Sequence, residues 1–443
     1  MIDYNICAHA DFYKNCHYSM FPKNMAYGYS YLSARKGKVL WFGLRYYLIK
    51  YLTGNVVTIE KIKEAKELID NSLGKNVFNL NDWMDILFRY NGKLPVKIKS
   101  LNEVNYVNAG IPLLTIENTD CRHPWLSSYL ETLLVNVWYP TSVATLARTY
   151  KEMLEIYSRT CEWPQEWLKT ALSNSGMRSS ACPEAGALAS AAHLLSFDCT
   201  AAPAGISLLK KYYNFGQKIS ITNGAEHSVI TSFGQENELS AYISCLNSFP
   251  ELPITIPVDS YNIYYAVEKF FGEDLKELIL NRPGTVYVRP DSGDVIPVLL
   301  KVTKILADKF GYRVNIKGYN IINKIRIIQG DGINKKSLPN ICKAIIENGF
   351  SLENYKFGCG GSLVHSDINR DTFGFAQKLS NIEMLNGENR GICKNPITDI
   401  NKKSIKGKFN VIKKFGNYII SNTEESFYLN ELITVLNNGD LIN

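Results

Sequence analysis

Between about residues 218 and 361 the chain repeats one local pattern five times: a short β-branched or aromatic run that ends in glycine or charge. The runs lead to His227, Asp259, Arg289, Gly330 and Gly360, which are separated by 32, 30, 41 and 30 residues. Each interval is about the length of one strand-plus-helix unit. Because consecutive units of this kind place parallel strands in one sheet, the pattern predicts an α/β fold. We expect the polar strand ends to meet at one edge of that sheet.

Other segments predict the remaining elements. The helices "PVLLKVTKILADKFG" and "LPNICKAIIENG" should stop at Gly311 and Gly349, since glycine after the last turn accepts a left-handed conformation. The run "TIEKIKEAKELIDNSL" is typical of an amphipathic helix, and "SSYLETLLVNVWYPTSVATLARTYKEMLEIYSRTC" predicts one long helical stretch. The segment "KLPVKIKSLNEVNYVNAGIPLLTIEN" alternates with period two, which indicates antiparallel strands. We therefore expect a separate β-rich layer before the α/β part.

Composition limits the function classes. A chain of 443 residues with 46% hydrophobic residues has room for two or three domains. The net charge of +7 comes from 49 basic and 42 acidic residues that are interspersed, so small anions are favoured and nucleic acid is not expected as a partner. Ten cysteines without a CxxC pair argue against zinc and a disulfide framework. With no signal-like or membrane-spanning apolar run, we expect no membrane partner and a cytoplasmic location in a bacterial or phage-infected cell.

The strand ends carry chemistry suited to a phosphorylated sugar. Arg289 offers a fixed fork of donors for phosphate oxygens. Asp259 and Asp291 are hard oxygen ligands that could hold Mg²⁺ or accept hydrogen bonds from ribose hydroxyls. The glycines of "IIQGDG" and "FGCGG" allow backbone N–H groups to approach phosphate, although neither segment is a Walker or dinucleotide motif. The residues together predict a cradle for a magnesium-bound sugar phosphate.

Each of these residues also has a structural interpretation. A strand-end aspartate or glycine is more often part of a turn or a helix cap. His227 could be a structural histidine bonded to a carbonyl group, and His193, within "ALASAAHLL", fits that description better. The lysines of "NKKSIKGKFNVIKK" would ordinarily be a solvated surface. The expected convergence of the strand ends is what favours a functional site.

Several segments, in the same order along nearly the whole chain, resemble the nicotinamide phosphoribosyltransferase family. They include "DFYKNCHYSMFP", "WFGLRYYLIKYL", "GAEHSVITSFG", "VDSYNIYYAVEKFFGEDL", "VRPDSGD", "IIQGDGIN", "FGCGGSL" and "ICKNPITDINKKSIKGK", with a shortened C-terminus. The resemblance implies a type II phosphoribosyltransferase fold, in which an α/β barrel is joined by a β-rich domain from both chain ends. The implied divisions are residues 1–135, 136–369 and 370–443. It also implies a head-to-tail homodimer with active sites at the subunit interface.

The resemblance carries roles over by position. It implies that Arg178, His227 and Arg289 face pyrophosphate, and that Asp259 and Asp291 serve ribose and Mg²⁺. The sugar-phosphate site would be lined by Gly330, Asp331, Gly360 and Gly361. From the partner subunit would come Arg370, Lys378, Lys394 and Lys402, together with Tyr13, which stacks on the base, and the nearby Asp11. In the family the counterpart of His227 is also phosphorylated by ATP, so ATP is an expected facultative substrate.

Two residues depart from the family pattern at the base pocket. In "SNSGMR", Ser175 stands where the family has an aromatic ring that sandwiches nicotinamide against the tyrosine. In "CTAAPAG", Ala201 stands where the family has an aspartate that accepts a hydrogen bond from the carboxamide. Loss of a ring stack and a buried hydrogen bond, each of about 1 kcal/mol or more, should weaken nicotinamide binding by roughly ten- to a thousandfold unless neighbours compensate.

The implied enzyme is a pentosyltransferase that joins nicotinamide to 5-phosphoribosyl 1-pyrophosphate, giving nicotinamide mononucleotide and pyrophosphate. No general base is needed, because the attacking pyridine nitrogen carries no proton. Three alternatives stay open: ADP-ribose 1-pyrophosphate as a donor that would give NAD directly, nicotinate as the acceptor, and a non-catalytic relative that binds nucleotides. The first two change a substrate, whereas the third removes the chemistry.

Overall fold

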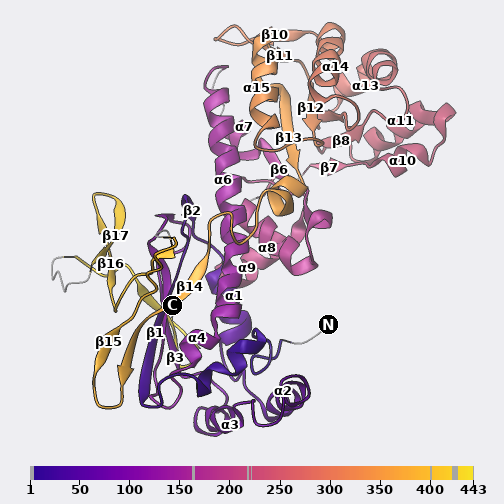
Figure 1. Ribbon diagram of the computed structural model, residues 1–443. Helices are drawn as coiled ribbons and strands as arrows, with labels where there is room; N and C mark the ends of the chain where they lie inside the picture. Colours follow the sequence, from indigo (N-terminus) through magenta and orange to yellow (C-terminus); the bar gives the residue numbers. More distant parts are fainter. Residues whose placement is uncertain are drawn as a thin grey trace. The chain divides into compact units, whose positions relative to one another are not determined.

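The computed structural model describes residues 4–161, 165–216, 219–220, 222–399, 402–421 and 428–442. Its contacts divide the chain into two compact units (Figure 1). Unit 1 comprises residues 1–145 and 369–443, and unit 2 comprises residues 146–368. The boundaries predicted from the sequence lie at 135/136 and 369/370. Among the described residues, no helix is both long enough and apolar enough to cross a bilayer.

Unit 1 is built on a seven-stranded sheet in the order β15-β14-β1-β5-β3-β18-β19, so both chain ends contribute to it. All of its pairings are antiparallel. The strands of unit 1 are β1 (Met25–Ser33), β2 (Lys38–Leu40), β3 (Val96–Ser100), β4 (Tyr106–Asn108), β5 (Pro112–Asn118), β14 (Ala376–Met384), β15 (Asn389–Gly391), β16 (Asn410–Lys414), β17 (Asn417–Ser421), β18 (Ile433–Asn437) and β19 (Asp440–Leu441). The period-two prediction for β3 and β5 is confirmed, because the two strands pair with each other.

The helices before residue 160 follow the predicted pattern with one correction. They are α1 (Leu44–Tyr47), α2 (Ile59–Ser72), α3 (Leu80–Arg89), α4 (Leu126–Tyr129), α5 (Glu131–Leu134) and α6 (Trp138–Ser158). The predicted amphipathic helix is α2, which begins after Thr58, whose side chain accepts a hydrogen bond from the Lys61 N–H. The expected single long helix is instead broken into α4, α5, a 3₁₀ turn and α6. Pro140 lacks an N–H and is tolerated only in a first turn, so α6 begins just before it.

Unit 2 is built on a six-stranded sheet in the order β6-β13-β12-β9-β8-β7. Every pairing in it is parallel, which forms half of a barrel. The strands are β6 (Leu172–Asn174), β7 (Asn223–Gly224), β8 (Ile254–Pro257), β9 (Val286–Arg289), β12 (Ile325–Gln329) and β13 (Tyr355–Cys359). The five predicted strands are thus neighbours in chain order, although Lys218 and Ile221 of the first lie outside the described residues. The prediction of one parallel sheet is confirmed.

Helices connect these strands, as expected for α/β units. They are α7 (Gln165–Thr170), α8 (Pro183–His193), α9 (Pro203–Tyr213), α10 (His227–Thr231), α11 (Glu238–Ser248), α12 (Ile263–Tyr265), α13 (Lys276–Asn281), α14 (Val295–Phe310) and α15 (Ser337–Glu347), with a small hairpin of β10 (Tyr312–Val314) and β11 (Asn320–Ile322). The predicted glycine stops are confirmed, because φ is +69° at Gly311 and +78° at Gly349. On β9, Val286 and Val288 are buried whereas Arg289 is only partly so. One face of the sheet is therefore core, and the other is free for polar chemistry.

The closest helix packing in unit 2 predicts a stability effect. A Cβ added at Gly205 in α9 would lie 2.3 Å from Ser190 Oγ and 2.6 Å from the Ala191 backbone nitrogen in α8. Gly205→Ala should therefore push the two helices apart and lower the free energy of unfolding by about 1–3 kcal/mol, measured by urea denaturation. Gly216→Ala, where an added Cβ meets nothing within 4 Å, is the matched control. Equal denaturation midpoints for the two variants would contradict this packing.

Candidate functional site

Four predicted residues meet at the carboxyl ends of β8 and β9 in unit 2. The backbone N–H of Asp291 donates to Asp259 Oδ2 at 3.1 Å, which ties the two strand ends together. Arg289 Nε lies 3.2 Å from Asp291 Oδ2. His227 Nε2 lies 3.7 Å from Asp259 Oδ1 and 3.5 Å from Asp291 Oδ2. The convergence expected from the parallel sheet is therefore found for these side chains.

The cluster contains two buried polar atoms that make no hydrogen bond in the described part of the chain, although each lies within ion-pair distance of a neighbour. Within the described residues, Asp259 Oδ1 and Arg289 Nε are buried and make no aligned hydrogen bond. The Asp259 side chain is only 3% exposed, so an unpartnered carboxylate oxygen there is costly. A cation at Oδ1 and an anion at the guanidinium would satisfy both groups. Asp259 and Asp291 supply hard oxygen donors of the kind that Mg²⁺ takes, although no group of three or more His, Cys, Asp or Glu side chains gathers as a metal site among the described residues.

His227 is positioned by a residue that sequence reasoning missed. Its Nδ1 lies 3.2 Å from Ser260 Oγ, and its side chain is 40% exposed on the first turn of α10. A hydroxyl group on Nδ1 fixes the ring orientation and leaves Nε2 directed at the carboxylates. The signal was available, because Ser260 directly follows Asp259 in "VDSY".

A cavity of about 850 Å³ along the free face of the sheet holds most of the remaining predicted residues of unit 2. Ser175, Arg178, Ala201, Arg289, Asp291, Gly330 and Asp331 all line it. Two backbone bonds connect its rim: Ser175 N–H donates to Cys359 O at 3.0 Å, and Ala201 N–H donates to Asn174 O at 3.0 Å. Ser175 and Ala201 therefore stand at one mouth, where they contribute a hydroxyl and a methyl group.

Glycines keep the strand ends of this cavity open. A Cβ at Gly330 would lie 3.4 Å from Asp291 Oδ1, and one at Gly360 would lie 3.6 Å from Ser175 Oγ. A Cβ at Gly361 would lie 3.5 Å from Ser366 Oγ, at the start of a short π-helix (Ser362–Ser366). A side chain at Gly330 would occupy the space in front of Asp291, whereas side chains at Gly360 and Gly361, which are not among the residues that line the cavity, would meet serine hydroxyl groups. The predicted role for bare backbone is consistent with these distances, and the ligand contacts stay a prediction.

The residues expected to act from a partner subunit lie on unit 1. The Tyr13 hydroxyl donates to Asp11 Oδ2 at 3.1 Å, and Thr132 Oγ1 donates to the same oxygen at 3.2 Å. Tyr13 is 58% exposed, with Lys14 Nζ over its ring at 5.7 Å from the centroid and the His17 ring centroid at 5.3 Å. The charge of Arg370 is close enough to lower the pKa of Tyr13, although burial and Asp11 raise it overall.

Two of the predicted cations of unit 1, Lys378 and Lys394, belong to one basic cluster with Arg35 and Lys14. Burial lowers the pKa of Lys378, and the positive charges of Arg35, Lys14 and Lys394 lower it further, against Glu131. Glu131 lies 2.6 Å from Lys14 Nζ and 3.9 Å from Lys378 Nζ. Such mutual repulsion indicates a place where anions are favoured.

Lys402 belongs to the neighbouring loop. Lys394 and Ser404 bond to each other, with Lys394 N–H donating to Ser404 Oγ at 2.8 Å and Ser404 N–H donating to Lys394 O at 2.9 Å. Lys402 Nζ lies 3.5 Å from Asp399 Oδ2. Arg370 Nη2 lies 3.1 Å from Asp371 Oδ1. Both ion pairs are exposed and therefore exchangeable for a ligand phosphate.

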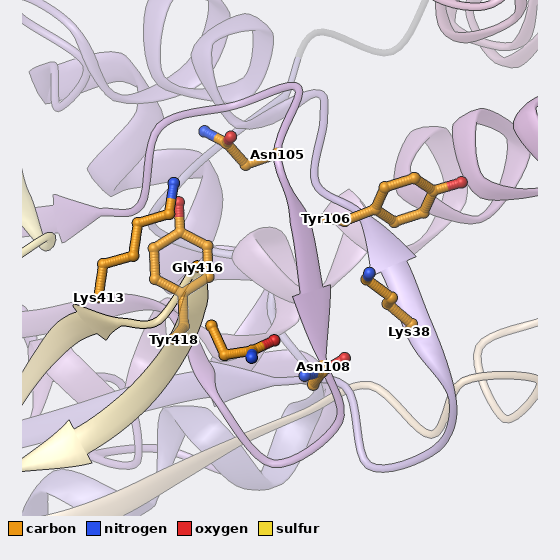
Figure 2. A pocket seen from close by; sticks show the side chains of 8 residues that line it. Lys38, Asn105, Tyr106, Asn108, Lys413, Gly416 and Tyr418 are labelled. Carbon is orange, nitrogen blue, oxygen red and sulfur yellow. The ribbon is translucent and has the colours of Figure 1, made fainter.

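A second, smaller hollow lies in unit 1. It measures about 190 Å³ and is lined by Lys38, Asn105, Tyr106, Asn108, Lys413, Gly416, Asn417 and Tyr418, from the hairpin strands β2, β4, β16 and β17 (Figure 2). None of these residues was predicted to bind substrate. The chemistry is concentrated in the larger cavity of unit 2.

Family profiles match most of the chain. Residues 176–440 match the Nicotinate phosphoribosyltransferase (NAPRTase) family, and residues 5–98 match the Nicotinamide phosphoribosyltransferase, N-terminal domain. A nicotinamide phosphoribosyltransferase of Xanthomonas campestris pv. campestris (strain 8004) is 36% identical over 415 residues, 92% of this chain and 88% of the relative. Another, of Acinetobacter baylyi (strain ATCC 33305 / BD413 / ADP1), is 28% identical over 97% of this chain and 93% of the relative.

A solved structure supports the fold. The crystal structure of nicotinate-nucleotide pyrophosphorylase from Pyrococcus furiosus superposes with a TM-score of 0.62. The superposition covers 98% of this chain and 90% of that chain at 14% sequence identity. A likeness at this identity concerns the fold, including the parallel half-barrel sheet and the antiparallel sheet.

The buried histidine of unit 2 predicts a pH effect on stability. His193 is fully buried, stacks on Phe197 at 4.9 Å and lies with Nε2 3.1 Å from Cys199 O, so its structural interpretation is supported. Burial lowers the pKa of His193 to about 4, whereas an unfolded histidine titrates near 6.5. The neutral ring is favoured in the folded chain, so stability is complete above about pH 6.5 and falls by up to about 1.4 kcal/mol per pH unit between there and pH 4. Urea titrations across that range should show this slope, and His193→Gln should lack it.

Proposed function

The chain belongs to the nicotinamide phosphoribosyltransferase family, and on that premise we propose that it joins nicotinamide to 5-phosphoribosyl 1-pyrophosphate. The products are nicotinamide mononucleotide and pyrophosphate, which is a salvage step toward NAD. The fold is that of the type II phosphoribosyltransferases, and we propose that its half-barrel closes into a barrel past the bridge between Cys199 and Ser220. The observation that carries the proposal is the Arg289–Asp291–Asp259–His227 cluster at the strand ends.

The cluster suits the charge that develops in this reaction. As the bond from ribose C1 to the pyrophosphate oxygen lengthens, negative charge grows on the leaving group and positive charge on the ribose. The guanidinium of Arg289 stabilises the leaving group, and carboxylates near the ribose stabilise the positive centre. The pyridine nitrogen donates its lone pair to C1, and the leaving oxygen keeps the electron pair of the broken bond. No proton moves, because the attacking pyridine nitrogen carries none.

Asp259 and Asp291 would hold Mg²⁺, directly or through water. When bound, the ion would neutralise pyrophosphate charge in the way that Lewis acids assist phosphoryl leaving groups. The protein supplies two carboxylates, so the remaining coordination positions of the ion would be filled by water and by oxygen atoms of the ribosyl pyrophosphate substrate. The unpartnered Asp259 Oδ1 supports this assignment.

The exposed groups of unit 1 complete the proposal. We propose a head-to-tail homodimer in which Tyr13 of one chain covers the base bound to the other. Arg370, Lys378, Lys394 and Lys402 would bind the phosphates of that same ligand. An exposed ring beside a basic cluster has the chemistry for this role.

ATP is a proposed facultative substrate at His227. The side chain is 40% exposed and Ser260 holds Nδ1, so we propose Nε2 as the atom that accepts a phosphoryl group. We also place the reaction in a reducing cytoplasm, which agrees with ten unpaired cysteines.

The donor and the chemistry are both tested by one product assay. Purified protein, Mg²⁺ and nicotinamide are mixed with either phosphoribosyl pyrophosphate or ADP-ribose 1-pyrophosphate, and products are identified by mass spectrometry. We expect nicotinamide mononucleotide from the first donor. NAD formed from the second donor alone would favour the direct NAD-forming alternative. That alternative is considered because Ser175 and Ala201, which line the cavity, depart from the family pattern. If neither donor gives a product, the result would favour a non-catalytic binding protein.

The leaving-group role of Arg289 is tested by substitution. Arg289→Gln shortens the side chain and removes its charge, so kcat/KM should fall by about a hundredfold or more, because one strong charge-assisted contact to the leaving group is lost. Arg313→Gln, which removes an arginine that is 62% exposed in the same unit, is the matched control and should retain activity. Near-equal steady-state rates for the two variants would remove Arg289 from the reaction.

The shared active site is tested by mixing two inactive chains. Arg289→Gln damages the strand-end site of unit 2, whereas Lys394→Ala damages the basic cluster of unit 1. If each active site combines residues of two chains, mixed dimers carry one intact site of two, and an equal mixture should regain about a quarter of wild-type activity after subunit exchange. A mixture as inactive as its components would show that each chain builds its own site.

A further inference from the structure

Lys356 is a charged residue in an otherwise uncharged strand. It is the second residue of β13, Tyr355–Cys359, whose other members are buried. Its side chain lines the same cavity as Ser175, Ala201 and Arg289. No role was predicted for it, because a single lysine within a strand resembles an ordinary alternation toward solvent.

Strand register places Lys356 level with Arg289. Lys356 pairs with Ile328 on β12. Ile327 pairs with Val288, so Ile328 is level with Arg289, and Lys356 belongs to the same cross-sheet row. Two residues further along β13, a rise of roughly 7 Å, stands Gly358.

The row above Lys356 is open because it is made of glycine. A Cβ at Gly358 would lie 3.3 Å from the Gly330 Cα and 3.8 Å from Ser175 Oγ. Neither glycine places a side chain between the Lys356 amine and the mouth at Ser175.

The ammonium group has no carboxylate partner among the residues that the structure describes. Its recorded contact is a cation–π approach to the Tyr287 ring, with Nζ 5.2 Å from the centroid. A half-buried cation without an anion or a hydrogen-bond acceptor loses hydration that no contact replaces, which is unfavourable in the apo chain. Oxygen atoms of a ligand would correct it.

We propose that Lys356 recognises the oxygen substituent of the pyridine acceptor, which deepens the proposed function and rests on it. The family's usual contact is absent where Ala201 stands, and Lys356 supplies a donor that lines the same cavity. An ammonium donates to a carbonyl oxygen and binds a carboxylate more strongly. The acceptor class is therefore a pyridine with a carboxamide or carboxylate, with weaker discrimination between the two than an aspartate would impose. Lys356 stays protonated throughout and takes no part in bond exchange.

The test separates base recognition from donor binding and from turnover. Dissociation constants of nicotinamide and nicotinate are measured by ligand-observed NMR with Mg²⁺ and pyrophosphate present, for wild type, Lys356→Met and Lys356→Arg. KM for the donor is measured in parallel. We expect Lys356→Met to weaken nicotinate binding ten- to a hundredfold and nicotinamide binding three- to tenfold, with donor KM unchanged and Lys356→Arg partly restoring both.

Lys301→Met is the matched control, since Lys301 also lies over a tyrosine ring, 3.6 Å from the centroid of Tyr264, but outside the cavity. Equal loss of both bases, no loss, or a rise in donor KM alone would overturn the proposal, and so would a wild-type chain that binds neither base. Base binding that depends on Lys356 without any turnover would leave this inference standing and defeat the proposed reaction. Turnover of nicotinamide that is unaffected by Lys356→Met would support the proposed reaction and overturn the role of Lys356.

Discussion

The parallel pairing of β8 with β9 is the constraint on which the site depends. It sets Pro257 beside Arg289, so the loops that follow both strands begin at the same height. The Asp291 N–H then reaches the Asp259 carboxylate, and this one bond fixes two acidic side chains next to each other. Two neighbouring carboxylates repel each other, and the cations around them offset that repulsion. The geometry is therefore held by backbone pairing, while the charges remain available to a ligand.

The charge distribution of the cluster explains why a donor with both a cation and phosphates suits it. The ion pairs of the cluster have lengths of 3.2–3.7 Å: they join His227 to Asp259, His227 to Asp291, and Arg289 to Asp291. Even so, Asp259 Oδ1 and Arg289 Nε are buried and make no hydrogen bond to any residue that the structure describes. Closed structural ion-pair networks satisfy such atoms internally. Here a magnesium-bound pyrophosphate would complete the network. The negative charge that develops on the leaving group would then form beside charged groups that are already in place, and not in an apolar site.

The sequence was sufficient for the strands and for most strand-end residues, because a switch from β-branched to polar residues is a local signal. It predicted the run from β7 to β13, and it brought Asp259, Arg289 and Asp291 together correctly. It did not predict β6, since "LSN" is too short to show a period. The long helix prediction was wrong because continuous apolar periodicity does not reveal the 3₁₀ turn before α6.

Residues whose roles depend on tertiary neighbours were beyond the reach of sequence reasoning. The role of three residues follows only from their neighbours in the folded chain. Ser260 contacts the His227 ring, Glu131 lies beside two lysines, and Lys356 lies below a row of glycines. The proposed sharing of a site between two chains rests on the family resemblance alone, because assembly is not a local property of the sequence.

The most direct measurement of the central claim is a calorimetric titration of pyrophosphate into the protein, with and without Mg²⁺, for wild type and Asp259→Asn. If the strand-end cluster holds a magnesium pyrophosphate, wild type should bind it at least tenfold more tightly with Mg²⁺, and the variant should lose most of that gain. Binding that is equally strong without Mg²⁺, or a magnesium gain that survives in Asp259→Asn, would contradict the account.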